Sequence, residues 1–151
     1  MLRISRKSLL ALEAVIDIAY NARAEPVQAK EITARQGVPQ RYLEQVMQHL
    51  VRAGILKGVR GPRGGYRLAR ERRRISIGEV MRIAMSFDES EEEFDGGSDL
   101  GRRVVVPLIA SLQEELMKKL DAMTIEDVCR QARALSLGPG VVEKRDADFT
   151  I

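Results

Sequence analysis

Residues 58–68 read GVRGPRGGYRL, so four glycines and three arginines share one short stretch. Guanidinium groups bind phosphate oxygens through paired hydrogen bonds, and glycines let a backbone turn tightly and approach a partner closely. Residues 57–74 together contain eight Lys or Arg and one acid. This composition indicates a site for a polyanion. The competing interpretation, a nucleotide-phosphate loop, fits poorly because the GK[ST] ending of a P-loop is missing and a hairpin is the wrong setting for a dinucleotide fingerprint.

The flanks of this stretch predict a β-hairpin. Residues 55–59 and 66–69 are β-compatible and border the Gly/Pro-rich connector. If the helix that precedes it binds DNA, this hairpin is a wing, with Arg60 and Arg63 at its tip. Arginines in that position suit DNA phosphates, or a narrow A·T-rich minor groove where negative potential is concentrated.

A helix-turn-helix motif is predicted immediately before the hairpin. A short helix at residues 28–35 carries Ile32 inward, Gly37 permits a turn, and a second helix spans residues 39–52. An ordinary helical hairpin of the core has the same spacing, so that alternative stays open. The second helix has an apolar face of Leu43, Val46, Met47 and Leu50, and an opposite polar face of Gln40, Arg41, Glu44, Gln45, Gln48 and His49.

The polar face of the second helix favours base recognition. Arg pairs with guanine, Gln with adenine, and a carboxylate accepts a hydrogen bond from cytosine in the major groove. A solvated helix face more often carries Lys and Glu in i,i+4 pairs. We therefore interpret residues 39–52 as the helix that enters the major groove.

Charge is divided unevenly along the chain. Residues 1–84 contain 17 Lys or Arg against 7 Asp or Glu, whereas residues 85–151 contain 8 against 15. This asymmetry predicts a polyanion-binding half joined to a half with another task, although two merely solvated faces are the alternative.

The remaining apolar periodicity predicts three further helices. A first helix at residues 6–23 carries the stripe Leu9, Leu12, Val15, Ile16 and Ala19. Capping pairs begin two others: Ser76 with Glu79, for a helix through about Ala84, and Thr124 with Asp127, for a helix through about Leu135.

A long helix with one apolar stripe is expected between residues 105 and 123. A stripe of this length outside the DNA-binding unit predicts burial against a second copy of the chain. The alternative is packing on the chain's own first helix. Pro107 is expected in the first turn or at a bend. The predicted dimer-interface residues are Val105, Leu108, Ile109, Leu112, Leu116, Leu120 and Met123.

Three ordered motifs resemble one family. They are SRKSLLALEAVIDIA, RYLEQVMQHLVRAGILKGVRGPRGGYRLA and ISIGEVM, and the resemblance covers residues 1 to about 135. The family is the winged helix-turn-helix transcription regulators of the Rrf2 type, which include IscR, NsrR and CymR. The resemblance implies a homodimer that binds an imperfect palindrome in double-stranded DNA and usually represses transcription.

The resemblance also assigns roles to individual residues. It implies that the second helix of the motif reads the major groove and that a wing arginine enters the minor groove. Pro39 stands where a serine often caps this helix, which leaves the side-chain cap unexplained. By carry-over, Tyr42, Glu44 and Gln45 face DNA, Arg60 lies on the wing, and Lys7 lies near a phosphate.

The chain departs from the cluster-binding members of this family. Those members carry three cysteines between the helix after the wing and the long helix, but residues 87–103 here contain no Cys and no His. An iron–sulfur cluster needs thiolates, sometimes with histidine. We therefore expect no cofactor and no metal, as in the cluster-free, CymR-like members. Cys129 is interpreted as a buried small hydrophobic residue, with redox sensing as the alternative.

The acidic segment at residues 85–99 has no assigned role. Seven acids among residues 88–99 predict a solvated loop. Alternatives are a hard-cation site, docking of a basic partner protein, or contact with the basic wing.

The sequence therefore predicts a mainly α fold with a small β-hairpin wing. We expect a winged helix-turn-helix domain at residues 1–84, an acidic loop at 85–99, a dimerisation helix and a C-terminal helix at 100–136, and a flexible tail at 137–151. No catalytic constellation is present, so the expected function is a cytoplasmic, sequence-specific DNA-binding repressor with no membrane span. The alternative is a protein-interaction adaptor. The operator, the target genes and the signal, whether a partner protein, a small effector or oxidation, stay open.

Overall fold

The computed structural model describes residues 4–86, 95–135 and 137. Most of the predicted acidic loop and nearly all of the predicted tail lie outside these residues. Within them the chain is mainly helical with one two-stranded antiparallel sheet, which confirms the predicted fold class. In the part of the chain that is described, no helix has both the length and the apolar character needed to cross a membrane.

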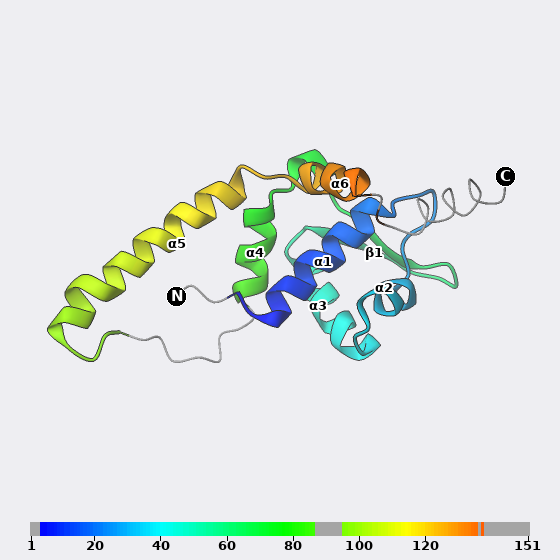
Figure 1. Cartoon of the computed structure of the whole chain (residues 1–151). Coiled ribbons are helices and arrows are strands. Elements are labelled where there is room, and N and C mark those ends of the chain that lie inside the picture. Colours follow the sequence, from blue (N-terminus) through cyan, green and yellow to red (C-terminus); the bar gives the residue numbers. More distant parts are fainter. Residues whose placement is uncertain (1–3, 87–94, 136, 138–151) are drawn as a thin grey trace.

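Helix α1 (Arg6–Tyr20) is the centre of the domain. It packs against α2, α3, α4, α6 and strand β2 (Figure 1). Its buried face includes Ala14, Val15 and Ile18, each at most 1% exposed. The predicted stripe was centred wrongly, because Leu9 is 52% exposed. The helix also ends at Tyr20, where the chain turns away at Asn21, and does not continue to residue 23.

The predicted helix-turn-helix is present as α2 (Ala29–Gln36) and α3 (Gln40–Arg52). Gly37 joins them with φ of +70°, a left-handed conformation that favours glycine, and its N–H donates to the Thr33 carbonyl at 2.8 Å. Ile32 of α2 is fully buried, and Leu43, Met47 and Leu50 of α3 are each at most 1% exposed. The amphipathic spacing of α3 therefore holds the helix on the core by one face and leaves the other to solvent.

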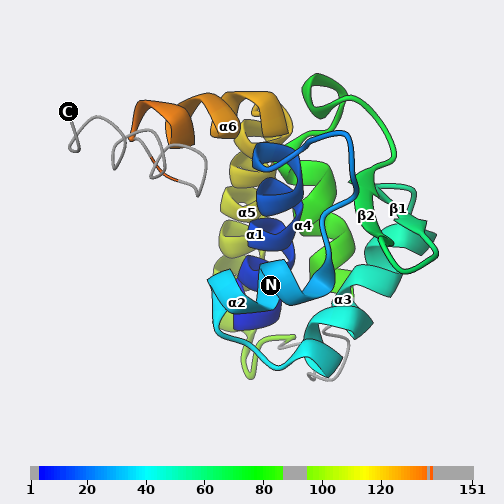
Figure 2. The same cartoon turned by 90° about the vertical axis from the view of Figure 1, so that its right-hand side faces the viewer.

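The predicted hairpin follows α3 as β1 (Leu56–Val59) and β2 (Gly65–Leu68). The strands are antiparallel, with Gly58 opposite Tyr66. We call β1, β2 and the loop at residues 60–64 the wing. In Figure 2, α3 and the wing lie on the same side of the molecule, and α5 runs behind α1 and α4.

A third segment pairs with the wing. The Val27 N–H donates to the Tyr66 carbonyl at 3.0 Å, and the Tyr66 N–H donates to the Val27 carbonyl at 2.8 Å. This pairing requires glycine at position 65, the residue before Tyr66. A Cβ on Gly65 would lie 2.3 Å from the Val27 carbonyl oxygen. The segment before α2 is thus fastened directly to the wing.

After the wing the chain forms a 3-10 turn, η1 (Arg72–Arg74), and α4 (Ile77–Ser86). The Ser76 hydroxyl accepts a hydrogen bond from the Glu79 N–H at 3.0 Å, as the predicted capping box requires. The Glu79 carboxylate instead pairs with the Arg70 guanidinium. The apolar face of α4 packs on the core, with Val80 fully buried.

The long helix begins as a π-helical turn, η2 (Gly101–Val105), and continues as α5 (Val106–Asp121). Pro107 is the second residue of α5 and directly follows the π-helical turn, so one helical N–H donor is missing at this junction. Figure 1 shows α5 extending away from the wing toward the opposite end of the molecule. Its second half packs against α4.

The end of α5 and α6 (Ile125–Ala134) return to the domain. Thr124 and Asp127 form the predicted capping box with bonds of 3.1 and 2.9 Å. Residues on either side of Thr124 pair with the start of α4: the Ile77 N–H donates to the Met123 carbonyl at 2.8 Å, and the Ile125 N–H donates to the Ile75 carbonyl at 2.9 Å. These bonds fix the start of α4 to the start of α6.

The Val27 contact generates a stability prediction. We expect Gly65→Ala to lower the free energy of unfolding by about 1–3 kcal/mol, because the new methyl group collides with a backbone carbonyl that cannot move without losing its pairing. Gly58→Ala, in the opposite strand, is the matched control. A Cβ there meets nothing within 4 Å, so its effect should stay within about 0.5 kcal/mol. Urea unfolding of both variants measures the difference, and equal effects would contradict the prediction.

Candidate nucleic-acid interface

The polar face of α3 is presented to solvent as the sequence predicts. Gln40, Arg41, Gln45 and Gln48 are exposed, whereas Glu44 and His49 are partly buried. The Gln40 side-chain amide donates to the Glu44 carboxylate at 3.0 Å, which orients two of these groups along one helical turn. Tyr42, assigned to the interface by resemblance, is partly buried and packs against the core. The exposed residues form a continuous row of hydrogen-bond donors and acceptors.

The wing carries its two predicted arginines at the tip. Arg60 and Arg63 are both exposed, on the loop between β1 and β2. The loop is closed by a 2.9 Å hydrogen bond from the Gly64 N–H to the Gly61 carbonyl, and Gly61 has φ of +116°. Arg63 lies beside Glu25, with Nη1 and Oε1 3.3 Å apart.

An open groove of about 620 Å³ separates α3 from the wing. The start of α2 forms its third wall. Gln40 and Arg60, predicted separately from the helix and the hairpin, both line it, together with Gln28, Ala29, Lys30, Val51, Gly58, Val59, Pro62, Gly64, Gly65 and Tyr66. We call this the α3–wing groove.

Three polar residues of the groove were missed by the sequence analysis: Gln28, Lys30 and Tyr66. Lys30 lies in the first turn of α2, where a cation beside a helix N-terminus favours an anion such as phosphate. The signal for it was a lysine at the start of the first helix of a helix-turn-helix. Tyr66 had no local signal; burial, with a contribution from the nearby Glu44 carboxylate, raises the pKa of its hydroxyl, so it stays a neutral donor.

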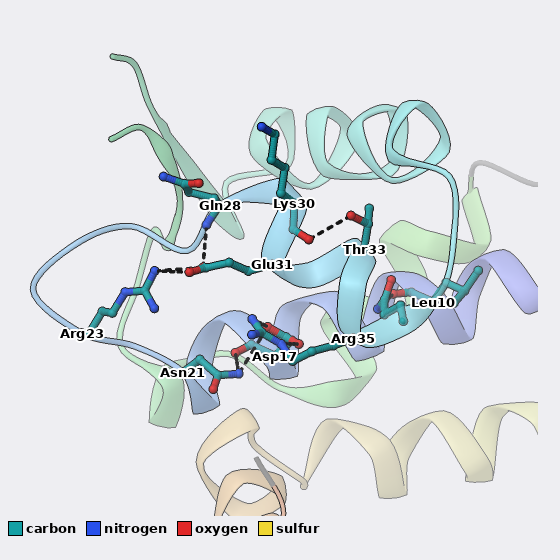
Figure 3. A network of polar contacts seen from close by, with 10 residues as sticks. Leu10, Asp17, Asn21, Arg23, Gln28, Lys30, Glu31, Thr33 and Arg35 are labelled. Atoms are coloured by element: carbon teal, nitrogen blue, oxygen red, sulfur yellow. Dashed lines mark hydrogen bonds and ion pairs between the residues drawn. The ribbon is translucent and has the colours of Figure 1, made fainter. Parts of the chain in front are cut away.

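Ion pairs set the position of α2 (Figure 3). The Arg35 guanidinium binds Asp17 of α1 with two 2.7 Å hydrogen bonds, and Arg23 binds Glu31 at 2.7 Å. Glu31 also accepts from the Gln28 N–H at 3.1 Å. Burial raises the pKa of Glu31, but these hydrogen bonds outweigh burial and lower it overall. The network therefore orients the α2 wall of the groove.

Lys7 and the arginine run lie away from the groove lining. Lys7 is exposed in the first turn of α1. Arg72 is partly buried and pairs with Glu126 of α6, and Arg73 pairs with Glu71 at 2.6 Å. At least part of the run at residues 72–74 is therefore structural and joins the wing exit to α6.

The predicted dimer stripe divides into two parts. Val105, Leu108 and Leu112 are 42%, 55% and 47% exposed, and Ile109 is half-buried. Leu120 and Met123 are partly buried against the chain's own core, and Leu116 lies beside Met81 of α4. Exposed Leu100 and Val104 extend the first part toward the start of the helix. The second half of α5 therefore packs within the chain, mainly on α4 rather than on the first helix that the alternative named, and the first half leaves most of its apolar side chains exposed.

Comparison with known proteins finds one family. A family model described as "Rrf2: Iron-dependent Transcriptional regulator" matches residues 4–131. The HTH-type transcriptional regulator IscR of Escherichia coli is 31% identical over 138 residues, which are 90% of this chain and 85% of that protein.

Solved structures agree with this comparison. The structure of T. potens IscR matches with a TM-score of 0.72 and 32% identity, and covers 94% of this chain and 96% of that one. CymR, described as the global cysteine regulator of B. subtilis, matches with a TM-score of 0.67 and 29% identity, and covers 87% and 98%.

The family description names iron, but the donor groups of this chain do not fit an iron–sulfur cluster. The full sequence has one Cys and one His, too few for a cluster held by Cys thiolates. Cys129 is fully buried on α6, while His49 lies on α3. Among the residues that the structure describes, no three His, Cys, Asp or Glu side chains are grouped so that they could hold a metal ion.

The environment of Cys129 predicts that its thiol reacts slowly. Its side chain is fully buried, and burial raises the pKa of the thiol. Because the thiolate is the reactive form, we expect a thiol reagent at neutral pH to label the native protein at least about tenfold more slowly than the urea-unfolded protein. Absorbance during the reaction measures both rates. Comparable rates would contradict the buried assignment, and Cys129→Ala identifies the background signal.

Proposed function

This chain belongs to the Rrf2 family of transcription regulators, and on that premise we propose that it binds DNA as a homodimeric repressor through the α3–wing groove. The chain is a DNA-binding regulator with a winged helix-turn-helix. The proposal concerns how its residues meet the duplex. The observation that carries it is that Gln40 of α3, Arg60 of the wing and Lys30 of α2 line one groove.

In the proposed complex α3 lies in the major groove. The exposed Arg41, Gln45 and Gln48 are suited to base edges, since Arg pairs with guanine and Gln with adenine. The wing then follows the adjoining backbone, with Arg60 or Arg63 directed to the minor groove. Lys7, Lys30 and Tyr66 supply phosphate contacts, which position the protein without reading sequence.

We further propose that two copies join through the exposed part of α5. Five large apolar side chains are exposed in a single protomer on η2, on α5 and at the residue just before η2: Leu100, Val104, Val105, Leu108 and Leu112. An apolar helix face of this kind is stabilised when a second copy covers it. A twofold dimer places two α3 helices in symmetric half-sites, so the operator is expected to be an imperfect palindrome.

The proposed control of DNA binding does not use a bound cluster. The donor residues for one are missing, so a partner protein or a small effector is the proposed signal. Repression follows if the dimer occupies a site that the transcription machinery needs.

The first test concerns base recognition. We expect Gln45→Ala to weaken discrimination at one base pair by about 1–3 kcal/mol, because a two-point contact between an amide and a base is lost. Selection of preferred sites from a random duplex pool, followed by binding titrations, measures this. Gln131→Ala removes an exposed glutamine on α6 and should leave the preference unchanged.

The same titrations separate a DNA-binding regulator from a protein-interaction adaptor. Affinity for duplex DNA should fall steeply with salt, since phosphate contacts release counterions. An unaltered site preference in Gln45→Ala would contradict insertion of α3, and the lack of any steep salt dependence would favour the adaptor.

The second test concerns the dimer. We expect Leu108→Glu to weaken dimerisation by at least about 2 kcal/mol, because it places an unpaired charge in a desolvated apolar contact. Leu108 is 55% exposed in one protomer, so folding should be little affected. Sedimentation equilibrium measures the association. Leu135→Glu, at a leucine that is 69% exposed at the end of α6, is the control and should stay dimeric. If the Leu108→Glu protein dimerises as well as the unaltered protein, α5 is not the dimer interface.

A further inference from the structure

We propose that Glu25 is a built-in competitor of DNA for the wing arginine Arg63, so that this carboxylate sets the affinity and salt dependence of duplex binding. The inference rests on the proposed function. It adds a residue to the interface that opposes binding and that lies outside the helix-turn-helix and the wing.

The contact joins two distant parts of the chain. Glu25 lies in the connection between α1 and α2, and Arg63 lies at the wing tip. Arg63 Nη1 and Glu25 Oε1 are 3.3 Å apart, and their side chains are 83% and 55% exposed. An ion pair this exposed is weak, because water screens it. It is therefore able to exchange with another anion, such as a DNA phosphate.

The position of Glu25 is imposed by the backbone on both of its sides. Before it, the Arg67 guanidinium donates to the Arg23 carbonyl at 3.1 Å and to the Ala24 carbonyl. After it, Val27 pairs with Tyr66 through two backbone hydrogen bonds. Arg67 and Tyr66 both belong to β2, so the connection is fastened to the wing one residue before Glu25 and two residues after it. These flanking hydrogen bonds therefore hold the Glu25 carboxylate next to the wing.

The connection is also fastened to the helix-turn-helix. Arg23 pairs with Glu31 of α2 at 2.7 Å (Figure 3). The backbone that carries Glu25 is thus held by both the wing and α2, and we expect it to keep Glu25 near Arg63 when a duplex occupies the groove. A phosphate at the wing tip must compete for the Arg63 guanidinium, and it also experiences repulsion from a fixed negative charge.

This arrangement gives a defined electrostatic signature. With Glu25→Gln, Arg63 no longer has a carboxylate partner there, and the repulsion is removed. We expect two- to tenfold tighter duplex binding at about 50 mM salt. The gain should be smaller at about 200 mM, because salt screens both the attraction of Glu25 for Arg63 and its repulsion of the phosphate. The log–log dependence of affinity on salt should steepen by up to about 0.9, the value for one additional phosphate neutralised.

The experiment is a double-mutant cycle in the full-length protein, read by fluorescence anisotropy on a labelled random-sequence duplex. The proteins are the unaltered chain, Glu25→Gln, Arg63→Ala and the double variant. Glu114→Gln is the matched control, since it removes the same charge from an exposed position on α5. Glu25→Gln should bind more tightly than Glu114→Gln, and most of that gain should vanish in the Arg63→Ala background.

The outcomes separate this inference from the function on which it rests. If the unaltered protein binds the duplex with steep salt dependence but Glu25→Gln behaves like Glu114→Gln, the competitor role is wrong and the proposed function stands. An equal gain in the presence and absence of Arg63 would also overturn it, because Glu25 would then act only as a general negative charge. If the unaltered protein binds no duplex, the proposed function itself fails.

Discussion

A hairpin with four residues in each strand cannot hold a fixed position in water without support. The wing therefore depends on the backbone pairing between Val27 and Tyr66, which supplies hydrogen bonds from a third segment. That pairing is close enough to require glycine at position 65. At the start of β1, the fully buried Ile55 and the nearly buried Leu56 attach the base of the wing to the core. The α3–wing groove exists because these contacts keep the hairpin at a set distance from α3.

A comparable set of contacts holds the segment that follows the wing. The pairing of Ser76 with Thr124 joins the start of α4 to the start of α6, and the ion pair between Arg72 and Glu126 lies beside it. Arg82 of α4 adds a 2.7 Å bond to Asp121 at the end of α5. The end of the long helix is thus connected by hydrogen bonds and ion pairs to the segment that leaves the wing. This connection therefore joins the long helix to the segment that follows the wing.

Local features of the fold were predictable because they depend on residues close in sequence. The spacing of Leu43, Val46, Met47 and Leu50 identified α3, and glycine placement identified the turn and the wing. Contacts between distant residues had no such signal: Asp17 with Arg35, Val27 with Tyr66 and Glu25 with Arg63 each join separate segments. Periodicity also identifies an apolar face without identifying its partner. For this reason the predicted stripe of α5 contains both exposed Leu108 and partly buried Leu120, and the stripe assigned to α1 included the exposed Leu9.

The same limit applies to electrostatics, because net charge says little about the field at the groove. Several arginines of the basic half are engaged within the chain, among them Arg23, Arg35, Arg70, Arg72 and Arg82, each paired with a carboxylate. Such pairs cancel most of their charge at a distance. The groove is instead lined by Lys30 and Arg60, while Arg63 pairs with Glu25 at the wing tip and Glu44 accepts a hydrogen bond from Gln40. Duplex affinity should therefore follow the arrangement of these few side chains more closely than the excess of basic residues in the first half of the sequence.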